Sequence, residues 1–360
     1  MKVRAALIMG AGEPLEVIEG ELREPETGEV RVRIDASGVC RSDLHAGGTG
    51  EQIGFPAVLG HEGAGVIEAV GPGSRLAVGD HVVLSWSPKC GTCPRCVEGR
   101  PNLCQGLITN GTAAGFTFEG RPVSAYMGVG SLAEQVIVTE RRAVPVPADL
   151  PSEALCLIGC GVATGWGAAV RTAGTAVGDR VAVFGCGGVG LSAIQGAREA
   201  GAVSIIAVDP DAGRRDLAMR LGATSTIDSD AVNATQAVLE QTTGGADIAI
   251  EATGHPEVMS RLLDSVRPGG KAVIIGLPAA DAMVTVSPFH LLYEKNLTGS
   301  IYGSVDPHIE FPIMAELYRQ GRLDIDSLRG NTFTLDQVND AIAELAEQRS
   351  PRPLVLPNAE

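Results

Sequence analysis

Hydrophobic and polar residues follow two different patterns along the chain. Before residue 150, short segments alternate between apolar and polar positions, as in EVRVRIDA at 29–36 and GAGVIEAVG at 63–71. Gly and Pro turns separate these segments. A period of two predicts short, half-buried strands, so we expect this part of the chain to form an all-β domain.

The pattern changes at about residue 155. VAVFGCGGVGLSAIQGAREAGA at 181–202 predicts a strand, a glycine-rich turn and a helix, and GRRDLAMRLG at 213–222 predicts another helix. Further strands are predicted at 204–211, 223–228, 246–254 and 271–278. Repeated alternation of strands and helices predicts a parallel, doubly wound sheet. A mixed tail after residue 302, with a helix near 336–348, closes the chain.

Length and composition limit the class of protein. A chain of 360 residues suggests two domains, and 44% hydrophobic with 20% charged residues is typical of globular proteins. The net charge of -15 argues against nucleic acid or an anionic membrane as the main partner. The apolar run at the N-terminus is too short for a signal peptide, so we expect a cytoplasmic protein.

Four of the eight cysteines lie within fifteen residues, in CGTCPRCVEGRPNLC at 90–104. The spacing, with glycines and prolines turning the backbone between the thiols, suits one tetrahedral zinc ion. Four cysteine ligands leave no open position, so we expect a structural zinc site. The ligands are Cys90, Cys93, Cys96 and Cys104. Four reduced thiols without metal are the alternative, and the acidic charge disfavours a zinc ribbon that binds DNA.

The glycine-rich turn predicts a dinucleotide site. Gly185, Gly187, Gly188 and Gly190, with Val189 between the last two, follow an apolar strand directly and open a helix. Asp209 ends the next strand, 19 residues beyond Gly190, at the distance typical of an acid that binds the adenosine ribose. Its charge would repel a 2′-phosphate, which favours NAD over NADP. Arg214 and Arg215 could contact the ribose or lie on a solvated helix face, and Cys186 is expected to pack inside.

A second set of residues could hold a catalytic metal. GVCRSDLH places Cys40, Ser42, Asp43 and His45 in one turn-like segment, and GHEG places His61 and Glu62 at the start of a strand. Cys160, in LIGCGVATG, is a third candidate, and Cys156 competes with it. Neither short motif is decisive alone, because an isolated Cys or His is usually a core residue.

Together, CRSDLH, GHEGAG, the four-cysteine lobe, LIGCGVATG and VAVFGCGGVG resemble, in order and spacing, the zinc-dependent medium-chain alcohol dehydrogenases. The resemblance implies a GroES-like catalytic domain at 1–161 and 302–360, with a zinc lobe at about 88–106, and a Rossmann domain at 162–301. It implies that Cys40, His61 and Cys160 bind a catalytic zinc ion, with Cys156 as the competing third ligand. Glu62 would assist ligand exchange and Asp43 would orient His61. Arg41 and Arg352 would contact the pyrophosphate, although Arg352 could equally be a surface charge.

The resemblance also implies a reaction. Zinc lowers the pKa of a bound alcohol, Ser42 takes its proton, His45 passes the proton to solvent, and NAD receives the hydride. The expected substrate is an aromatic or medium-chain primary alcohol, and the alternative is a thiol adduct of formaldehyde. Residues expected to line the pocket are Glu51 at its mouth, Trp86, Tyr126, Met127, Leu277 and Ile301. A nucleotide-binding protein without activity is a further alternative, which the complete set of residues disfavours.

The same resemblance predicts a homodimer. The segment 109–128 resembles the longer connection found in dimeric family members. The strand near LTGSIYG at 297–303 would pair with its copy across a two-fold axis and so remove an exposed sheet edge.

Overall fold

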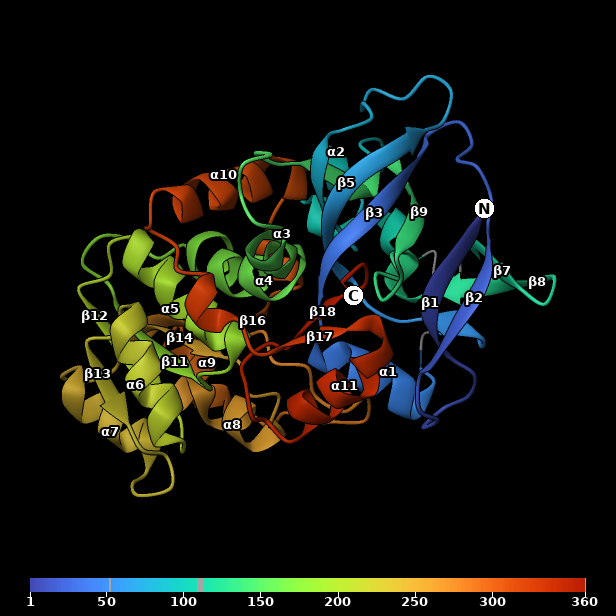
Figure 1. Ribbon diagram of the computed structural model, residues 1–360. Helices are drawn as coiled ribbons and strands as arrows, with labels where there is room; N and C mark the ends of the chain where they lie inside the picture. The colour runs from blue at the N-terminus through green and yellow to red at the C-terminus, as the bar shows by residue number, and fades with distance from the viewer. Residues whose placement is uncertain (52, 109–112, 360) are drawn as a thin grey trace. The chain divides into compact units, whose positions relative to one another are not determined.

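The computed structural model of the protein describes residues 1–51, 53–108 and 113–359 (Figure 1). Contacts within the chain divide it into two compact units. The first comprises Met1–Cys160 and Asp306–Glu360, and the second comprises Gly161–Val305.

The first unit is built on two β-structures. Strands β1, β2, β7, β8 and β4 form a closed barrel. Their bounds are Lys2–Ile8, Glu16–Leu22, Ala113–Phe118, Arg121–Ala125 and Ala57–Val58. A second sheet has the order β10-β6-β5-β3-β18-β17, and β9 also pairs with β3. Its strands span Ala143–Pro145, His81–Leu84, Glu62–Val70, Glu29–Gly38, Leu354–Leu356, Thr332–Thr334 and, for β9, Gln135–Thr139. Buried and partly exposed residues alternate along most of β3, which confirms the predicted period of two.

The α-helices of the first unit have 4 to 13 residues. The α-helices are α1 Arg41–Thr49, α2 Pro94–Val97, α3 Ser152–Leu155, α10 Pro307–Arg319 and α11 Val338–Ala346. The 3₁₀ turns are η1 Pro101–Leu103, η2 Gln105–Ile108, η3 Tyr126–Gly128, η4 Glu140–Arg142, η5 Cys156–Gly159, η9 Asp326–Leu328 and η10 Leu335–Gln337. The turn-like segment expected at 40–45 is instead the first turn of α1, because the Asp43 carboxylate caps the Cys40 amide.

The second unit is a parallel sheet with the order β13-β12-β11-β14-β15-β16. These strands span Ser225–Ile227, Ser204–Val208, Arg180–Phe184, Ala246–Glu251, Val266–Ile274 and Asn296–Gly299. The helical segments are α4 Gly161–Gly167, η6 Ala168–Ala173, α5 Gly188–Glu199, α6 Ala212–Leu221, α7 Ala234–Gln241, α8 Pro256–Arg261, η7 Leu262–Asp264, α9 Pro288–Leu292 and η8 Tyr302–Ser304. The strand order reverses between β11 and β14, so a crevice for a dinucleotide is expected beyond their carboxyl ends. The predicted Rossmann sheet is confirmed.

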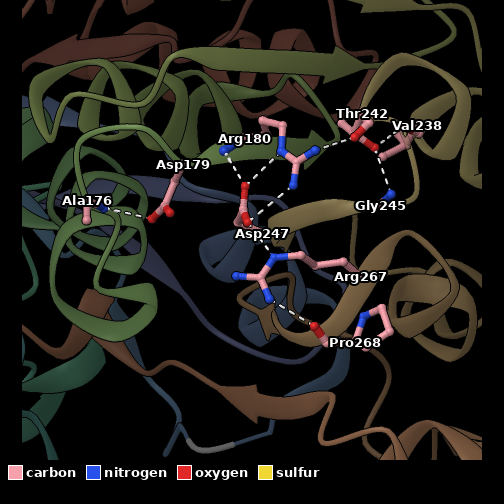
Figure 2. A network of polar contacts seen from close by, with 9 residues as sticks. All are labelled: Ala176, Asp179, Arg180, Val238, Thr242, Gly245, Asp247, Arg267 and Pro268. Carbon is pink, nitrogen blue, oxygen red and sulfur yellow. Dashed lines mark hydrogen bonds and ion pairs between the residues drawn. The ribbon is translucent and has the colours of Figure 1, made fainter.

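One ion-pair network joins three neighbouring strands of this sheet (Figure 2). Asp247, on β14, accepts hydrogen bonds from the backbone N and Nε of Arg180 on β11, at 2.8 and 3.0 Å. It also accepts one from Nε of Arg267 on β15, at 2.5 Å. These residues lie at the amino ends of β11 and β14, opposite the ends that face the expected crevice.

Within the described residues, no single helix is long and apolar enough to cross a membrane. Two consecutive short helical segments, Ser152–Gly159 and Gly161–Ala173, pass that test only as a bent pair.

Candidate active site

Four side chains from three segments of the first unit lie close together. Cys40, His61, Glu62 and Cys160 each present a possible ligand atom, and these atoms all lie within 4.8 Å of one another. His61 and Glu62 are fully buried and Cys40 is 8% exposed. Two sulfurs, an imidazole and a carboxylate are donors that suit Zn²⁺.

Asp43 fixes the orientation of His61. Its Oδ1 accepts hydrogen bonds from His61 Nδ1 at 3.1 Å and from the Gly60 amide at 3.0 Å, while Oδ2 accepts one from the Cys40 amide at 2.9 Å. The bond to Nδ1 leaves His61 Nε2 directed toward the cluster. A carboxylate that fixes the far nitrogen in this way is a common support for a metal-binding histidine.

The Ser42 hydroxyl lies beside the same donors. Its Oγ is 3.2 Å from Cys40 Sγ and 3.3 Å from His61 Nε2. Tyr126 closes this side of the cluster, because its ring meets that of His61 edge-on at 5.6 Å and its hydroxyl donates to the Ser42 carbonyl at 3.1 Å. The Ser42 hydroxyl is therefore within hydrogen-bonding distance of two of the side chains that would hold a metal ion.

Charges within the cluster depend on one another. A hydrogen bond from Cys160 holds the pKa of the Cys40 thiol well below its usual range, against the effect of burial, and the same bond raises the pKa of Cys160. Burial opposes protonation of His61, but the Asp43 carboxylate raises the pKa of this imidazole. Burial raises the pKa of Glu62 to about 7, while the charge of Arg352 acts in the opposite direction.

Cys156 does not join the cluster. It is fully buried, its thiol donates to the Glu153 carbonyl at 3.5 Å, and burial raises its pKa. Cys160, four residues later, directs its sulfur to the donor group instead.

The four cysteines of the lobe also converge. Cys90 Sγ lies 3.9 Å from Cys96 Sγ, and Cys93 Sγ lies 3.9 Å from Cys104 Sγ. Four sulfurs around one zinc ion at about 2.3 Å would be about 3.8 Å apart, so the spacing fits. Backbone amides donate to these sulfurs, and the amides of Thr92 and Cys93 lower the pKa of the Cys90 thiol to about 5.

The glycine-rich turn has the geometry that a pyrophosphate requires. Gly185 has a φ of +92°, and a Cβ at Gly190 would lie 1.8 Å from the Gly185 carbonyl, so both positions need glycine. A Cβ at Gly187 would meet nothing within 4 Å, and Gly188 and Val189 form the first turn of α5. The α5 N-terminus is therefore open to an anion.

Asp209, at the end of β12, is held against this turn. Its Oδ2 accepts from the Cys186 amide at 2.7 Å and its Oδ1 from the Asp211 amide at 2.9 Å. Arg215 donates to the Asp209 and Pro210 carbonyls, both at 2.7 Å, and pairs with Asp228, so it is not on a solvated face. Arg214 is half-buried in the first turn of α6.

Comparison with known proteins decides the family. The model of the alcohol dehydrogenase GroES-like domain matches residues 26–148, and that of zinc-binding dehydrogenases matches residues 188–320. An alcohol dehydrogenase class-3 from Cereibacter sphaeroides is 36% identical over 99% of this chain and 100% of its own. An S-(hydroxymethyl)glutathione dehydrogenase from Paracoccus denitrificans is 36% identical over the same shares. The crystal structure of benzyl alcohol dehydrogenase from Acinetobacter calcoaceticus is 34% identical, covers 99% of both chains and has a TM-score of 0.93.

The chain belongs to the zinc-dependent medium-chain alcohol dehydrogenase family. It is accordingly an oxidoreductase, and its first unit has the GroES-like fold of the family.

Two predicted residues of this dehydrogenase have a partner that the sequence did not suggest. His45 Nε2 lies 3.1 Å from Glu51 Oε2, so the residue expected at the pocket mouth contacts the residue expected to release the proton. Both side chains reach solvent, at 36% and 49% exposure.

The burial of Arg352 decides one of the two alternatives left open for this residue. It is 5% exposed, so the alternative of a surface charge is wrong. The Arg352 Nε atom lies 3.6 Å from Glu62 Oε2. Arg41, the other arginine expected to contact the pyrophosphate, is exposed on the first turn of α1. Burial alone would lower the pKa of the Arg352 guanidinium, but the neighbouring Glu62 and Cys40 raise it above its usual range.

The other residues that the sequence predicted for the pocket belong to different units. Trp86, Tyr126 and Met127 pack against the core of the first unit. Leu277 and Ile301 belong to the second unit, and they are 63% and 45% exposed.

Sequence reasoning missed Arg142. This side chain is buried and donates to the carbonyls of Trp86 and Met127. No motif marks it, since a contact between residues 86, 127 and 142 appears only after folding.

Proposed function

We propose that this enzyme oxidises a primary alcohol to the aldehyde, reversibly, and transfers the hydride to NAD. The observation that carries the proposal is the convergence of Cys40, His61 and Cys160, with the Ser42 hydroxyl 3.2 and 3.3 Å from the first two. These three residues would hold zinc, which supplies a Lewis acid that polarises the alcohol oxygen and eases the loss of its proton. NAD, when bound, accepts the hydride.

Ser42 and His45 would transfer the proton of the alcohol to solvent. Ser42 Oγ accepts the proton of the alcohol and donates its own along a hydrogen-bonded path toward His45. Ser42 and His45 are three residues apart on α1 and share one face of the helix. Because His45 reaches solvent, it can release the proton to water.

Neighbouring groups keep the ligands in place. Asp43 holds His61 Nδ1, and the Arg352–Glu62 pair stands beside the donors. Glu62, as a fourth possible donor in the cluster, would take the place of a leaving ligand during exchange. Loss of the Asp43 carboxylate should weaken zinc binding about 10- to 100-fold.

The cofactor preference follows from Asp209. Its carboxylate lies at the carboxyl end of β12, beside the glycine-rich turn. The ribose hydroxyls of NAD could donate hydrogen bonds to this carboxylate. A 2′-phosphate would meet this negative charge. Arg41, Arg214 and Arg352 are proposed as further contacts to the cofactor.

A benzyl-type or medium-chain primary alcohol is the proposed substrate. The apolar side chains of Trp86, Tyr126 and Met127 support it, as does the similarity to benzyl alcohol dehydrogenase. Each buried methylene contributes about 0.8 kcal/mol, so larger alcohols should be preferred to ethanol.

The alternative substrate, a thiol adduct of formaldehyde, is supported by the relatives named S-(hydroxymethyl)glutathione dehydrogenase. Glu51 could meet a polar group of the thiol, although its carboxylate already contacts His45.

A panel of substrates with NAD and NADP tests the proposal through the absorbance of reduced nicotinamide. We expect benzyl alcohol and octanol to have higher kcat/KM than ethanol or methanol, without added thiol. Glu51→Leu should keep that order. If formaldehyde with glutathione exceeds every free alcohol, and Glu51→Leu removes the advantage, the alternative is correct. Absence of turnover with all of them would refute the proposed activity.

We further propose two zinc ions per chain, in a cytoplasmic homodimer. The donor geometry of the two clusters supports the metal count, and eight free cysteines suit a reducing compartment. The edge position of β16 and the exposed apolar residues near it support the dimer. Part of the segment 109–128, residues 109–112, lies outside the described residues.

A further inference from the structure

Arg142 is a buried cation at the end of η4, where the chain enters β10. The residue is 5% exposed. Its Nη1 donates to the Met127 carbonyl at 2.8 Å, to the Trp86 carbonyl at 2.9 Å and to the Ser85 carbonyl at 3.4 Å. The Ser85 amide in turn donates to the Arg142 carbonyl at 2.7 Å. One side chain therefore joins two loops that are about forty residues apart in sequence.

The second of these loops has an unusual backbone. Met127 has a φ of +51°, and Gly128 and Gly130 have φ values of +67° and +65°. A left-handed conformation is uncommon for a residue with a side chain, so surrounding contacts must hold Met127 in it. A Cβ at Gly128 would lie 2.5 Å from Arg142 Nη2, which shows how closely the guanidinium fills the space inside this turn.

The same turn carries a wall of the active site. Tyr126, directly before Met127, lies edge-on to the His61 ring at 5.6 Å and donates to the Ser42 carbonyl at 3.1 Å. A shift of the Met127 carbonyl would therefore move Tyr126 against a proposed metal ligand and the proposed proton acceptor. Trp86, held by the same guanidinium, would move with it.

We propose that Arg142 is a positioning residue that determines which alcohols this enzyme accepts. It acts through Tyr126, Met127 and Trp86, and it does not touch substrate. The planar guanidinium offers several donors in a rigid geometry, which lysine cannot reproduce. This inference rests on the proposed alcohol oxidation, and it concerns only residues of the first unit.

The test compares Arg142→Met and Arg142→Lys with Arg141→Met, which changes an exposed neighbour of equal size. For each, kcat and KM are measured with benzyl alcohol and with ethanol, together with bound zinc and the melting temperature. We expect the benzyl-to-ethanol ratio of kcat/KM to fall about tenfold in Arg142→Met, mainly through KM for benzyl alcohol. Arg142→Lys should recover part of the ratio and Arg141→Met should leave it unchanged.

A spectroscopic measurement makes the test independent of turnover. The chain has two tryptophans, so Trp166→Phe leaves Trp86 as the single reporter. Against this background, Arg142→Met and Arg142→Lys should change the emission maximum and iodide quenching of Trp86, and Arg141→Met should not.

The outcomes separate the two proposals. If the wild type oxidises alcohols but the substrate ratio and Trp86 emission are unchanged in both Arg142 variants, Arg142 has only a structural role and the inference is wrong. Equal loss of activity on both alcohols, with a lower melting temperature, would also overturn it. If the wild type oxidises no alcohol, the proposed function fails, and the Trp86 signal still decides whether Arg142 positions this loop.

Discussion

Cys160 and Cys156 are four residues apart, yet their sulfur atoms have different surroundings. Cys160 Sγ lies with the donors of Cys40 and His61, whereas the Cys156 thiol donates to a backbone carbonyl in the core. Cys156 begins η5, whereas Cys160 follows its end with a non-helical backbone (φ −147°, ψ −75°), so the two side chains leave the chain in different directions.

Replacement of each cysteine by alanine should separate the roles. Cys160→Ala should lose one zinc ion and reduce kcat on the order of 10³-fold, because the Lewis acid is no longer held. It should still fold and bind NAD. Cys156→Ala should retain both zinc ions and most activity. Metal analysis and steady-state kinetics check this, and normal activity in Cys160→Ala would transfer the ligand role to Cys156.

Asp209 offers a second test at the level of one side chain. Asp209→Ser removes the acceptor for the ribose hydroxyls and the negative charge that repels a 2′-phosphate. We expect KM for NAD to rise and kcat/KM with NADP to improve. Asp211→Ser, which alters the exposed cap of α6, is the matched control and should preserve the preference for NAD. A wild type that already prefers NADP would contradict this role.

Among the elements, the cysteine lobe has little apolar material of its own. In α2 no residue is buried, and Val97 on it is 74% exposed. A segment of this kind cannot fold on a hydrophobic core, so metal binding must supply most of its stability.

Removal of one lobe ligand should therefore unfold the lobe locally. Cys90→Ser should reduce bound zinc from two ions to one and lower the melting temperature, with aggregation of the freed segment. Val97→Ala, on the same short helix, should behave as the wild type. Zinc analysis and thermal unfolding measure both effects, and a fully stable Cys90→Ser protein with one zinc would show that the lobe does not depend on its metal.

The network around Asp247 stabilises the parallel sheet by joining β11, β14 and β15 (Figure 2). Although burial alone would raise its pKa, hydrogen bonds from Arg180 and Arg267 hold the pKa of this carboxyl well below its usual range. The carboxyl thus releases its proton more readily in the folded state than in the unfolded state.

The contribution of Asp247 to the stability of the fold therefore depends on pH. Stability from Asp247 is present above the ordinary carboxyl pKa of about 3.9 and is lost as the pH falls below it. Asp247→Asn should reduce the free energy of unfolding by about 1–3 kcal/mol at neutral pH, and the difference from the wild type should shrink below about pH 4. Asp149→Asn, at a surface pair with Arg319, should cost about 0–1 kcal/mol. Urea unfolding measures both, and a difference that grows on acidification would contradict the sign.

For the molecule as a whole, the edge of the parallel sheet is the feature that bears on assembly. Strand β16 is an end strand, and large apolar side chains after β15 are exposed in the isolated chain. They include Met283, Phe289, Leu291, Leu292 and Tyr293, at 59–82% exposure. An open strand edge with apolar neighbours favours pairing with a second copy.

We expect light scattering to give twice the mass of one chain at micromolar concentration. Leu292→Asp should shift the equilibrium toward the monomer, because it buries a charge in the proposed contact. Val177→Asp, at an equally apolar but separate exposed position in the same unit, should remain dimeric. A wild-type monomer or tetramer would exclude this assembly.

Much of this protein could be predicted from its sequence, where the signal is local. Three such signals depend only on neighbouring residues in the chain. They are the strand periodicity at 29–36, the strand, turn and helix at 181–202, and the spacing of the four cysteines. Backbone geometry and ligand spacing act over such short distances, so the Rossmann sheet and the zinc-type lobe follow directly.

Tertiary structure decided what depends on distant residues. Cys160, and not Cys156, lies beside Cys40 and His61. Arg352 pairs with Glu62, and Arg142 donates hydrogen bonds to two loops. Each of these contacts joins segments that are far apart in the chain. The packing of the strands decides whether a buried charge or thiol faces a donor cluster or the core. Sequence periodicity describes only one helix or strand at a time, so it cannot predict this packing. The family's motifs therefore indicated the proposed ligands and Asp43 as the partner of His61, whereas the contacts of Arg352 and Arg142 became visible only in the folded chain.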